Sequence, residues 1–369
     1  MSTNNSQTRL QSLDALRGFD MLFIMGFSWF ISTVCRLWPC TFTDAVATSM
    51  GHPEWNGFTH HDTIFPLFLF IAGISFPFSW AKHRQNDMSR GKMYAKILRR
   101  VVFLIVLGWV YGGIFRLDFE HMRYVSVLGR IGVAWGIAAV LYMNAGCRTR
   151  ILIAALILIG YGLVSVFVGA PDVANADPLS FEGNFAGYFD RKFLPGRLYR
   201  GTFDPEGLFS TIPSIVTAML GMFTGEFIRR ENLSGERKTG LLILAALAFL
   251  VVGLSFSPVL PLNKSLWSST FVCVVGSYSL AMFALFYYLI EVRGWHRWAF
   301  AFRVIGLNSI TIYLAQRIVN FGHISDFFLK GIASKCPEIV APVILSAGYV
   351  TACWLFLYFL YRKRTFLKV

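Results

Sequence analysis

Ten apolar stretches, each long enough to cross a lipid bilayer, occupy most of this 369-residue chain. A membrane-spanning helix needs about 20 mainly apolar residues. The stretches cover residues 18–35, 63–81, 97–115, 125–143, 151–168, 208–227, 239–256, 266–290, 298–319 and 342–361. A content of 55% hydrophobic residues and a mean hydropathy of +0.56 exceed those of ordinary soluble domains. The pattern therefore predicts an all-α polytopic membrane protein with about ten transmembrane helices.

The net charge of +14 is distributed in a way that predicts topology. Basic residues gather in alternate loops: the set that runs from Arg9 to Lys368 holds twenty, and the opposite set holds ten. By the positive-inside rule, both termini are expected in the cytoplasm. The loops around residues 52, 169–206 and 258–264 then face outward. The charge is explained by topology and does not indicate a nucleic-acid partner. No cleavable signal peptide is expected, because Asp14 and Arg17 lead directly into a full-length span.

The chain reads as a single transmembrane domain, 1–369, with one external loop or cap at about 169–207. Aromatic residues in this loop predict a folded cap and not a linker, and long loops in compact domains are usually functional. Six cysteines are present. Cys35 and Cys40 lie close enough in sequence for a disulfide in an oxidising compartment, although packing of unrelated thiols is the simpler interpretation. No Cys-x-x-Cys spacing occurs and no metal is expected.

A polar patch, His52-Pro-Glu-Trp-Asn-Gly57, follows the first apolar stretch. An imidazole takes or gives a proton near neutral pH, which an amine or alcohol nucleophile needs when it attacks an acyl group. Trp55 offers a flat face for a sugar or an adenine. The alternative interpretation is an interfacial turn, in which Trp55 belongs to the aromatic belt and the His residues with Asp62 form a solvated rim.

Charged residues also lie within the apolar stretches. Asp14 and Arg17 bracket the entry to the first stretch, and Arg130 lies inside the fourth. A charge within a span is costly and usually marks a cavity, a partner or a pathway. Arg130 is therefore a candidate for binding an anionic group. Arg17 is either such a site or a snorkelling anchor.

Three further polar clusters are expected in or beside the membrane. Asp204 and Glu206 precede the sixth stretch, where a helix-capping role would also explain them. The other two clusters are Asn263-Lys264 with Trp267, at the start of the eighth stretch, and Asn308-Ser309 inside the ninth. Each by itself is more typical of contacts between helices than of a site. Together they favour a shared polar region.

These motifs, in this order, resemble the heparan-α-glucosaminide N-acetyltransferase family of transmembrane acyltransferases, which includes bacterial NagX-type members. The matching stretches are 9–18, 52–66, 127–131, 204–212, 262–267 and 306–310. The resemblance implies transfer of an acetyl group from cytosolic acetyl-CoA to an amino sugar on the opposite face. It also implies that His52, just before the Trp-Asn-Gly motif, is the catalytic histidine. Lysosomal members carry an Asn where this chain has Ser28.

On this basis we expect an acetyl-CoA-dependent amino-sugar N-acetyltransferase in the bacterial inner membrane, with a glucosamine-type acceptor, membrane lipids and a second copy of the chain as its partners. The expected contacts of acetyl-CoA are Arg17, Ser28, Arg130 and Asn308. The expected contacts of the acceptor are Trp55, Asn56, Asp62, Glu206, Asn263, Lys264 and Trp267. The sequence leaves open whether His52 deprotonates the amine or is itself transiently acetylated.

Two other functions remain open at this stage. One is a sugar or amino-sugar permease without chemistry, because Gly- and Pro-interrupted helices with intramembrane charges are also typical of transporters. The other is an O-acyltransferase of cell-envelope glycans that uses the same histidine.

Overall fold

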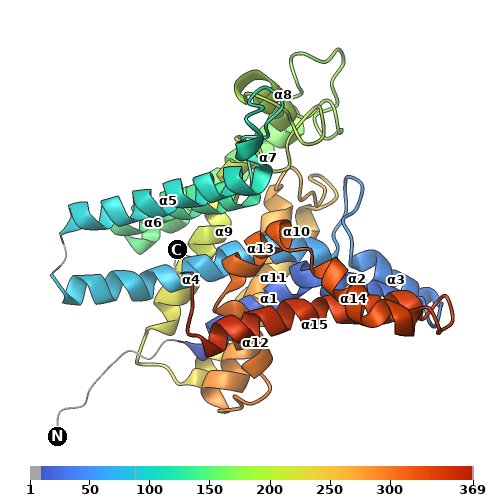
Figure 1. Cartoon of the computed structure of the whole chain (residues 1–369). Coiled ribbons are helices and arrows are strands. Elements are labelled where there is room, and N and C mark those ends of the chain that lie inside the picture. Colours follow the sequence, from blue (N-terminus) through green and yellow to red (C-terminus); the bar gives the residue numbers. More distant parts are fainter. Residues whose placement is uncertain (1–9, 88, 368–369) are drawn as a thin grey trace, which may run out of the picture. The chain divides into compact units, whose positions relative to one another are not determined.

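A computed structural model describes residues 10–87 and 89–367; Arg9 and Lys368, which entered the sequence analysis, lie outside them. These residues form helices and connecting loops, and within them extended pairing is limited to two isolated bridges. The helices are α1 (Gln11–Leu22), α2 (Ser28–Cys35), α3 (Thr41–Ser49), α4 (Ile64–Gln85), α5 (Arg90–Gly112), α6 (Val127–Asn144), α7 (Cys147–Phe167), α8 (Phe185–Phe193), α9 (Thr211–Ile228), α10 (Gly235–Phe256), α11 (Ser269–Tyr287), α12 (Phe300–Gly306), α13 (Ser309–Ile318), α14 (Phe321–Ala333) and α15 (Ala341–Arg362) (Figure 1).

Eight of the predicted stretches coincide with helices that are long and apolar enough to cross a membrane. The protein is thus an all-helical, multi-pass membrane protein, but the count of ten is not confirmed. The third stretch forms α5, which carries five basic residues in its first half and is less apolar as a whole. The ninth stretch is not one helix, because the chain turns at Leu307 and Asn308 between the short helices α12 and α13. The cytoplasmic position of the termini stays a prediction.

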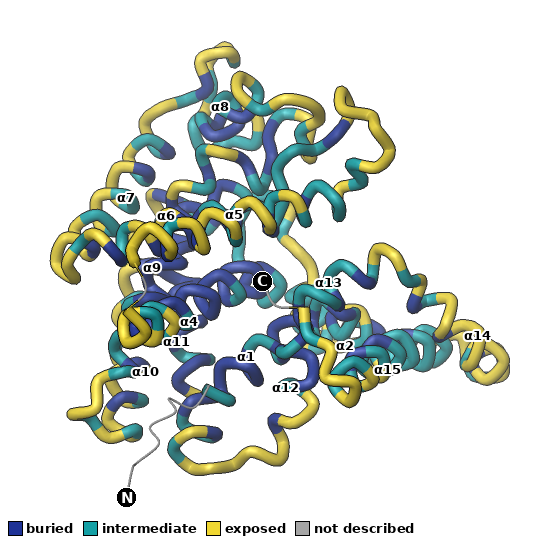
Figure 2. Tube along the Cα trace, turned by 60° about the vertical axis from the view of Figure 1, so that its left-hand side comes forward, coloured by how far each residue is buried: buried dark blue, intermediate teal, exposed yellow. Residues whose placement is uncertain are grey.

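The chain divides into two compact units, which we describe separately. One unit, which we call unit A, contains residues 48–232 and 244–280. In it, α4 packs along α9, and α6 packs on both. A Cβ on Gly73 would lie 2.3 Å from the carbonyl oxygen of Ala218, so only glycine permits this approach. As a result α4 and α9 are mostly buried, whereas α5, which lies beside α6, exposes one side (Figures 1 and 2).

The other unit, unit B, contains the described residues of the segments 1–47, 233–243 and 281–368. Its α1 and α12 touch backbone to backbone: a Cβ on Gly18 would lie 1.7 Å from the carbonyl oxygen of Phe302. A π-helical turn, Phe23–Phe27, separates α1 from α2, and Gly26 within it has a φ of 100°. The turn leaves the carbonyl of Ile24 able to accept a hydrogen bond from Gln316 of α13.

All six cysteines of the chain are free thiols in this structure. Cys35 ends α2 and Cys40 follows in the next loop, where Thr43 is its partner. The simpler of the two interpretations, unrelated thiols, therefore agrees with the structure.

Candidate active site

The polar patch of the sequence forms an irregular loop over residues 51–59, which the chain holds in two places. Gly57 has a φ of 140°, a region that favours glycine, and its amide donates to the carbonyl of Leu262 at 2.8 Å. At the other end, Thr59 caps the short helical turn His60–Thr63 in a capping box with Asp62. The loop is therefore fixed both to the segment before α11 and to the start of α4.

His52 and Asp62 form a hydrogen-bonded pair within this loop. The Nδ1 atom of His52 lies 2.7 Å from Oδ1 of Asp62, while Oδ2 of Asp62 accepts from the amide and the hydroxyl of Thr59, both at 3.1 Å. The Asp62 side chain is 1% exposed and the His52 side chain is 46% exposed. A buried carboxylate thus holds the Nδ1 edge of an imidazole ring that is about half exposed.

Lys264 completes this group, which we call the His52 site (His52, Asp62 and Lys264). Its Nζ atom lies 3.3 Å from Nε2 of His52 and 3.7 Å from Oδ1 of Asp62. Burial lowers the pKa of Lys264, and the carboxylates of Asp62 and Glu206 partly oppose that shift. The ring of His61 also stands edge-on to that of His52, with centroids 4.5 Å apart.

Asn56 and Trp55 tie the loop to other parts of unit A. The side-chain amide of Asn263 donates to Oδ1 of Asn56 at 3.0 Å. The indole of Trp55 donates to the carbonyl of Leu179 at 2.9 Å and packs against Phe181 and Phe203 of the 169–207 loop. That loop contains helix α8 and directly supports the His52 loop.

Trp267 and Arg130 are both buried in the interior of unit A. Trp267 has a φ of 53°, which is uncommon for a bulky residue, and is completely buried, with its indole donating to the hydroxyl of Thr217. The guanidinium of Arg130 on α6 lies 5.1 Å from the centre of that indole. Its Nη2 atom donates to the carbonyl of Gly207 and the hydroxyl of Ser210. Its buried Nε and Nη1 atoms have no acceptor among the described residues.

A charged network joins the cap to the loop between α5 and α6. The sequence predicted only Asp204 and Glu206 among its members. Arg123 pairs with both Asp204 and Glu206, so Glu206 is bound to a cation of the protein itself. Asp190 of α8 is 1% exposed and accepts from the amides of Asp204 and Leu208. Burial raises the pKa of Asp190 to about 7, although those two amide bonds act in the opposite direction. Neither Arg123 nor Asp190 was a predicted site residue.

The structure brings together in unit A the catalytic candidate, all seven expected acceptor contacts and Arg130. Three of these residues, Trp267, Asn263 and Asp62, are enclosed by the protein. Trp267 and Asn263 are buried and bonded to the protein, so they form the walls of the region and do not present a free surface. Asp62 is likewise enclosed by His52 and Thr59.

Arg17, Ser28 and Asn308, the other expected contacts of acetyl-CoA, belong to unit B. Arg17 lies 3.6 Å from Asp14 in α1. Ser28 starts α2, and its carbonyl accepts from the hydroxyl of Ser32. Asn308 fills the break between α12 and α13, and its side-chain amide donates to the carbonyl of Thr365.

The fold and this site define a class: multi-pass membrane proteins that carry a histidine–aspartate pair at the start of a long helix. Comparisons with known proteins narrow the class. Residues 9–115 match a family model described as a domain of unknown function, DUF5009. The whole chain is similar to heparan-alpha-glucosaminide N-acetyltransferase from Homo sapiens, with 25% identity over 98% of the chain, and to that from Mus musculus, with 24% over 99%.

The resemblance predicted from the motifs is thus confirmed, and the chain is a distant relative of heparan-alpha-glucosaminide N-acetyltransferases. It spans about 60% of the length of these curated relatives.

Proposed function

We propose that this protein transfers an acetyl group from cytosolic acetyl-CoA to the amino group of a glucosamine-type sugar at the periplasmic face of the bacterial inner membrane. The similarity to two N-acetyltransferases supports acyl transfer. The observation that carries the proposal is the His52–Asp62 pair, because an accessible imidazole fixed by a buried carboxylate is the arrangement that proton transfer from an amine requires.

Asp62 would hold the proton on Nδ1 of His52 and so leave the lone pair on Nε2, where the Lys264 ammonium lies at 3.3 Å and would give way to the amine. In direct transfer, Nε2 accepts the proton as the amine nitrogen bonds to the thioester carbonyl carbon. The carbon–sulfur bond then breaks, and His52 returns the proton to the leaving sulfur. In the alternative route, Nε2 itself carries the acetyl group between donor and acceptor. Asp62 serves either route as a positioning residue and not as the acceptor contact expected from the sequence.

Lys264 and Arg130 would supply positive charge. The ammonium of Lys264, beside Nε2 of His52, is placed to stabilise the oxyanion that forms on the carbonyl oxygen. The unsatisfied Nε and Nη1 atoms of Arg130 suit a carbonyl or anionic group of a substrate, because an unbonded polar group at that depth costs several kcal/mol.

Trp55, Asn56 and Glu206 remain the proposed acceptor contacts, with Asn263 and Trp267 supporting them. For acetyl-CoA we retain Arg17, Ser28 and Asn308 as proposed contacts. A guanidinium suits a phosphate, and the hydroxyl and amide suit the polar groups of the pantetheine arm. A homodimer is also retained as part of the proposal.

A labelled-acceptor assay tests the function. Purified protein is incubated with acetyl-CoA radiolabelled in the acetyl group and with glucosamine, and the expected product is labelled N-acetylglucosamine. A His121→Ala protein, altered at an exposed histidine of the loop between α5 and α6, is the control for a general loss of activity. Absence of any acetylated product would favour a permease. Acetylation of N-acetylglucosamine in place of glucosamine would favour an O-acyltransferase.

A further inference from the structure

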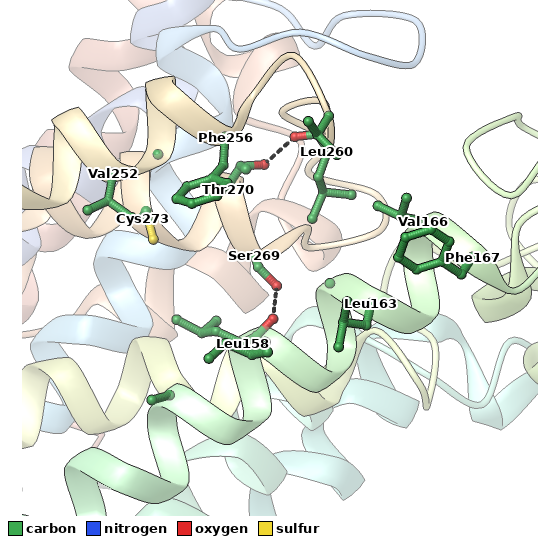
Figure 3. A pocket seen from close by; sticks show the side chains of 15 residues that line it. Leu158, Leu163, Val166, Phe167, Val252, Phe256, Leu260, Ser269, Thr270 and Cys273 are labelled. Atoms are coloured by element: carbon green, nitrogen blue, oxygen red, sulfur yellow. Dashed lines mark hydrogen bonds between the residues drawn. The ribbon is translucent and has the colours of Figure 1, made fainter.

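An apolar groove in unit A has no part in the chemistry proposed above. It has a volume of about 530 Å³ and lies between α7, α10 and the start of α11 (Figure 3). One wall is formed by Ala155 to Phe167 of α7, and the other by Val252 to Phe256 of α10 with Leu260 and Cys273. The volume is within the range of about 300–1,000 Å³ that is typical of small-molecule sites.

The residues that line the groove favour an apolar ligand. The hydroxyl of Ser269 donates to the carbonyl of Leu158 at 2.6 Å, and the hydroxyl of Thr270 donates to the carbonyl of Leu260 at 2.8 Å. The other lining residues have apolar side chains or are Gly162 and Gly253, apart from the thiol of Cys273. A polar ligand would therefore lose its bonds to water without replacement.

The position of the groove favours a hydrocarbon chain of a lipid as the ligand. Both α7 and α10 are candidate membrane spans, and their outward sides expose Leu163, Phe167, Val252 and other large apolar residues. From Ala155 to Phe167 the helix rises by about 18 Å at 1.5 Å per residue. One leaflet of a bilayer contributes about half of a hydrocarbon core that is about 30 Å thick. The length thus matches a single acyl chain that enters from one leaflet.

The groove shares a segment with the His52 site. Residues 260–270 run from the groove wall at Leu260, through Lys264, back to the wall at Ser269 and Thr270. The hydroxyl of Tyr161 on α7 also donates to the carbonyl of Leu266 in this segment. We propose that the groove binds one acyl chain of a membrane phospholipid, and that this chain supports the segment that positions Lys264 beside His52. The second half of this statement rests on the proposed function.

Photolabelling tests the binding without any need for acetyl transfer. The protein is placed in phosphatidylcholine nanodiscs in which one acyl chain carries a diazirine, and labelled residues are mapped by mass spectrometry. Labelling at Leu163, Val252 and Phe256 is expected to exceed that at Ile151 and Leu244, exposed residues of the same helices outside the groove, by several-fold. Equal labelling of the two sets of residues would overturn the proposal.

Two glycines of α7 provide matched variants. A Cβ on Gly162 would lie 3.4 Å from the hydroxyl of Ser269 and 3.6 Å from Leu260, whereas a Cβ on Gly160 would meet nothing within 4 Å. Gly162→Leu is expected to reduce labelling of the groove several-fold, and Gly160→Leu to leave it unchanged. Equal effects of the two variants would contradict the proposal, and thermal unfolding verifies that both proteins fold.

The effect on the site is measured separately. Delipidated wild type is expected to lose turnover and to recover it when phospholipid is added, and Gly162→Leu is expected not to recover. Lipid labelling without lipid-dependent turnover would overturn only the support of Lys264. Absence of acetyl transfer in every preparation would instead count against the proposed function and leave the labelling result intact.

Discussion

At the scale of single residues, Asp62 and His52 have different roles because their side chains differ in exposure to solvent. Asp62 is enclosed and already uses both of its oxygens, so it can only orient, while the half-exposed ring of His52 can meet a substrate. The loop between α5 and α6 contains a second His–Asp pair with which the His52–Asp62 pair can be compared. There, Asp118 lies 2.9 Å from Nδ1 of His121, and both side chains are exposed. An ion pair of that kind contributes little in water.

His52→Ala is expected to lower acetyl transfer by about 10²–10⁴-fold, because the group that moves the amine proton is lost. Turnover with labelled acetyl-CoA measures the effect, and binding of CoA should be retained. Turnover close to that of the wild type would remove His52 from the mechanism.

Asp62→Asn is expected to lower kcat with little change in KM. The amide can donate to Nδ1 of His52, which would place the imidazole proton on Nε2, where the lone pair is needed. The matched control is Asp118→Asn, which removes the carboxylate of the exposed pair and should leave kcat unchanged. If both variants behave alike, Asp62 does not position His52.

Arg130→Lys keeps the charge but loses the planar fork that makes several hydrogen bonds at once. Affinity for CoA or for the sugar, measured by calorimetry on folded protein, is expected to fall. If affinities and turnover are both unchanged, Arg130 serves only to join α6 to the start of α9 through Gly207 and Ser210.

At the scale of elements, helix ends and breaks carry the polar groups. Asn308 occupies the gap between α12 and α13, and Asp190 of α8 accepts amide bonds from Asp204 and Leu208 just before α9. Gly207 makes that junction possible, since a Cβ there would lie 1.9 Å from the Asp190 carboxylate.

The cap is expected to become less stable as pH rises through the titration of Asp190. The folded-state pKa of about 7 lies above the value of about 3.9 for an unfolded chain, so the folded protein binds more protons between those values. The contribution of Asp190 is thus fully present below about pH 4 and is lost as pH rises past 7. Thermal unfolding of wild type and Asp190→Asn from pH 5 to 8 checks this.

The melting temperature of wild type should fall relative to that of Asp190→Asn as pH rises, because only wild type loses the proton of a buried side chain. Asp177→Asn, which neutralises an exposed carboxylate of the same cap, controls for the loss of one negative charge. A difference that stays constant from pH 5 to 8 would show that Asp190 does not titrate there.

Much of the helix pattern could be predicted because apolar length is a local property. The His52 loop was also found locally, from residue types within a dozen positions. The sequence could not predict contacts between residues that are far apart in the chain, such as Lys264, which is 212 residues from His52. The orienting role of Asp62 could not be predicted either, because it depends on burial. Asp190 resembled any surface carboxylate, and Asn308-Ser309 in the ninth stretch was predicted as a polar cluster but not as a break in the helix.

At the scale of the whole molecule, the topology decides whether the proposed reaction is possible. Cytosolic acetyl-CoA and a periplasmic acceptor require that the His52 loop face outward and that the loop between α4 and α5 face inward. The His52 loop and the cap touch through Trp55 and Leu179 and so lie on the same side of the membrane, which requires that α5 cross it together with α4, α6 and α7.

Cysteine labelling in intact cells tests the orientation. In a background without the six native cysteines, a membrane-impermeant maleimide is expected to label Glu54→Cys and to spare Arg90→Cys. Labelling of both positions after the cells are opened is the control for reactivity. The reverse pattern in intact cells would invert the protein and rule out a cytosolic donor.

The π-helical turn in the first span has a consequence for biosynthesis. The carbonyl of Ile24 accepts a hydrogen bond from Gln316, which the ribosome adds 292 residues later. Until then the carbonyl of Ile24 lacks its hydrogen bond to Gln316. The segment that enters the membrane first therefore reaches its final hydrogen bonding only when one of the last segments arrives. A chain truncated before α13 should retain a first span that is more readily extracted from the bilayer than that of the complete protein.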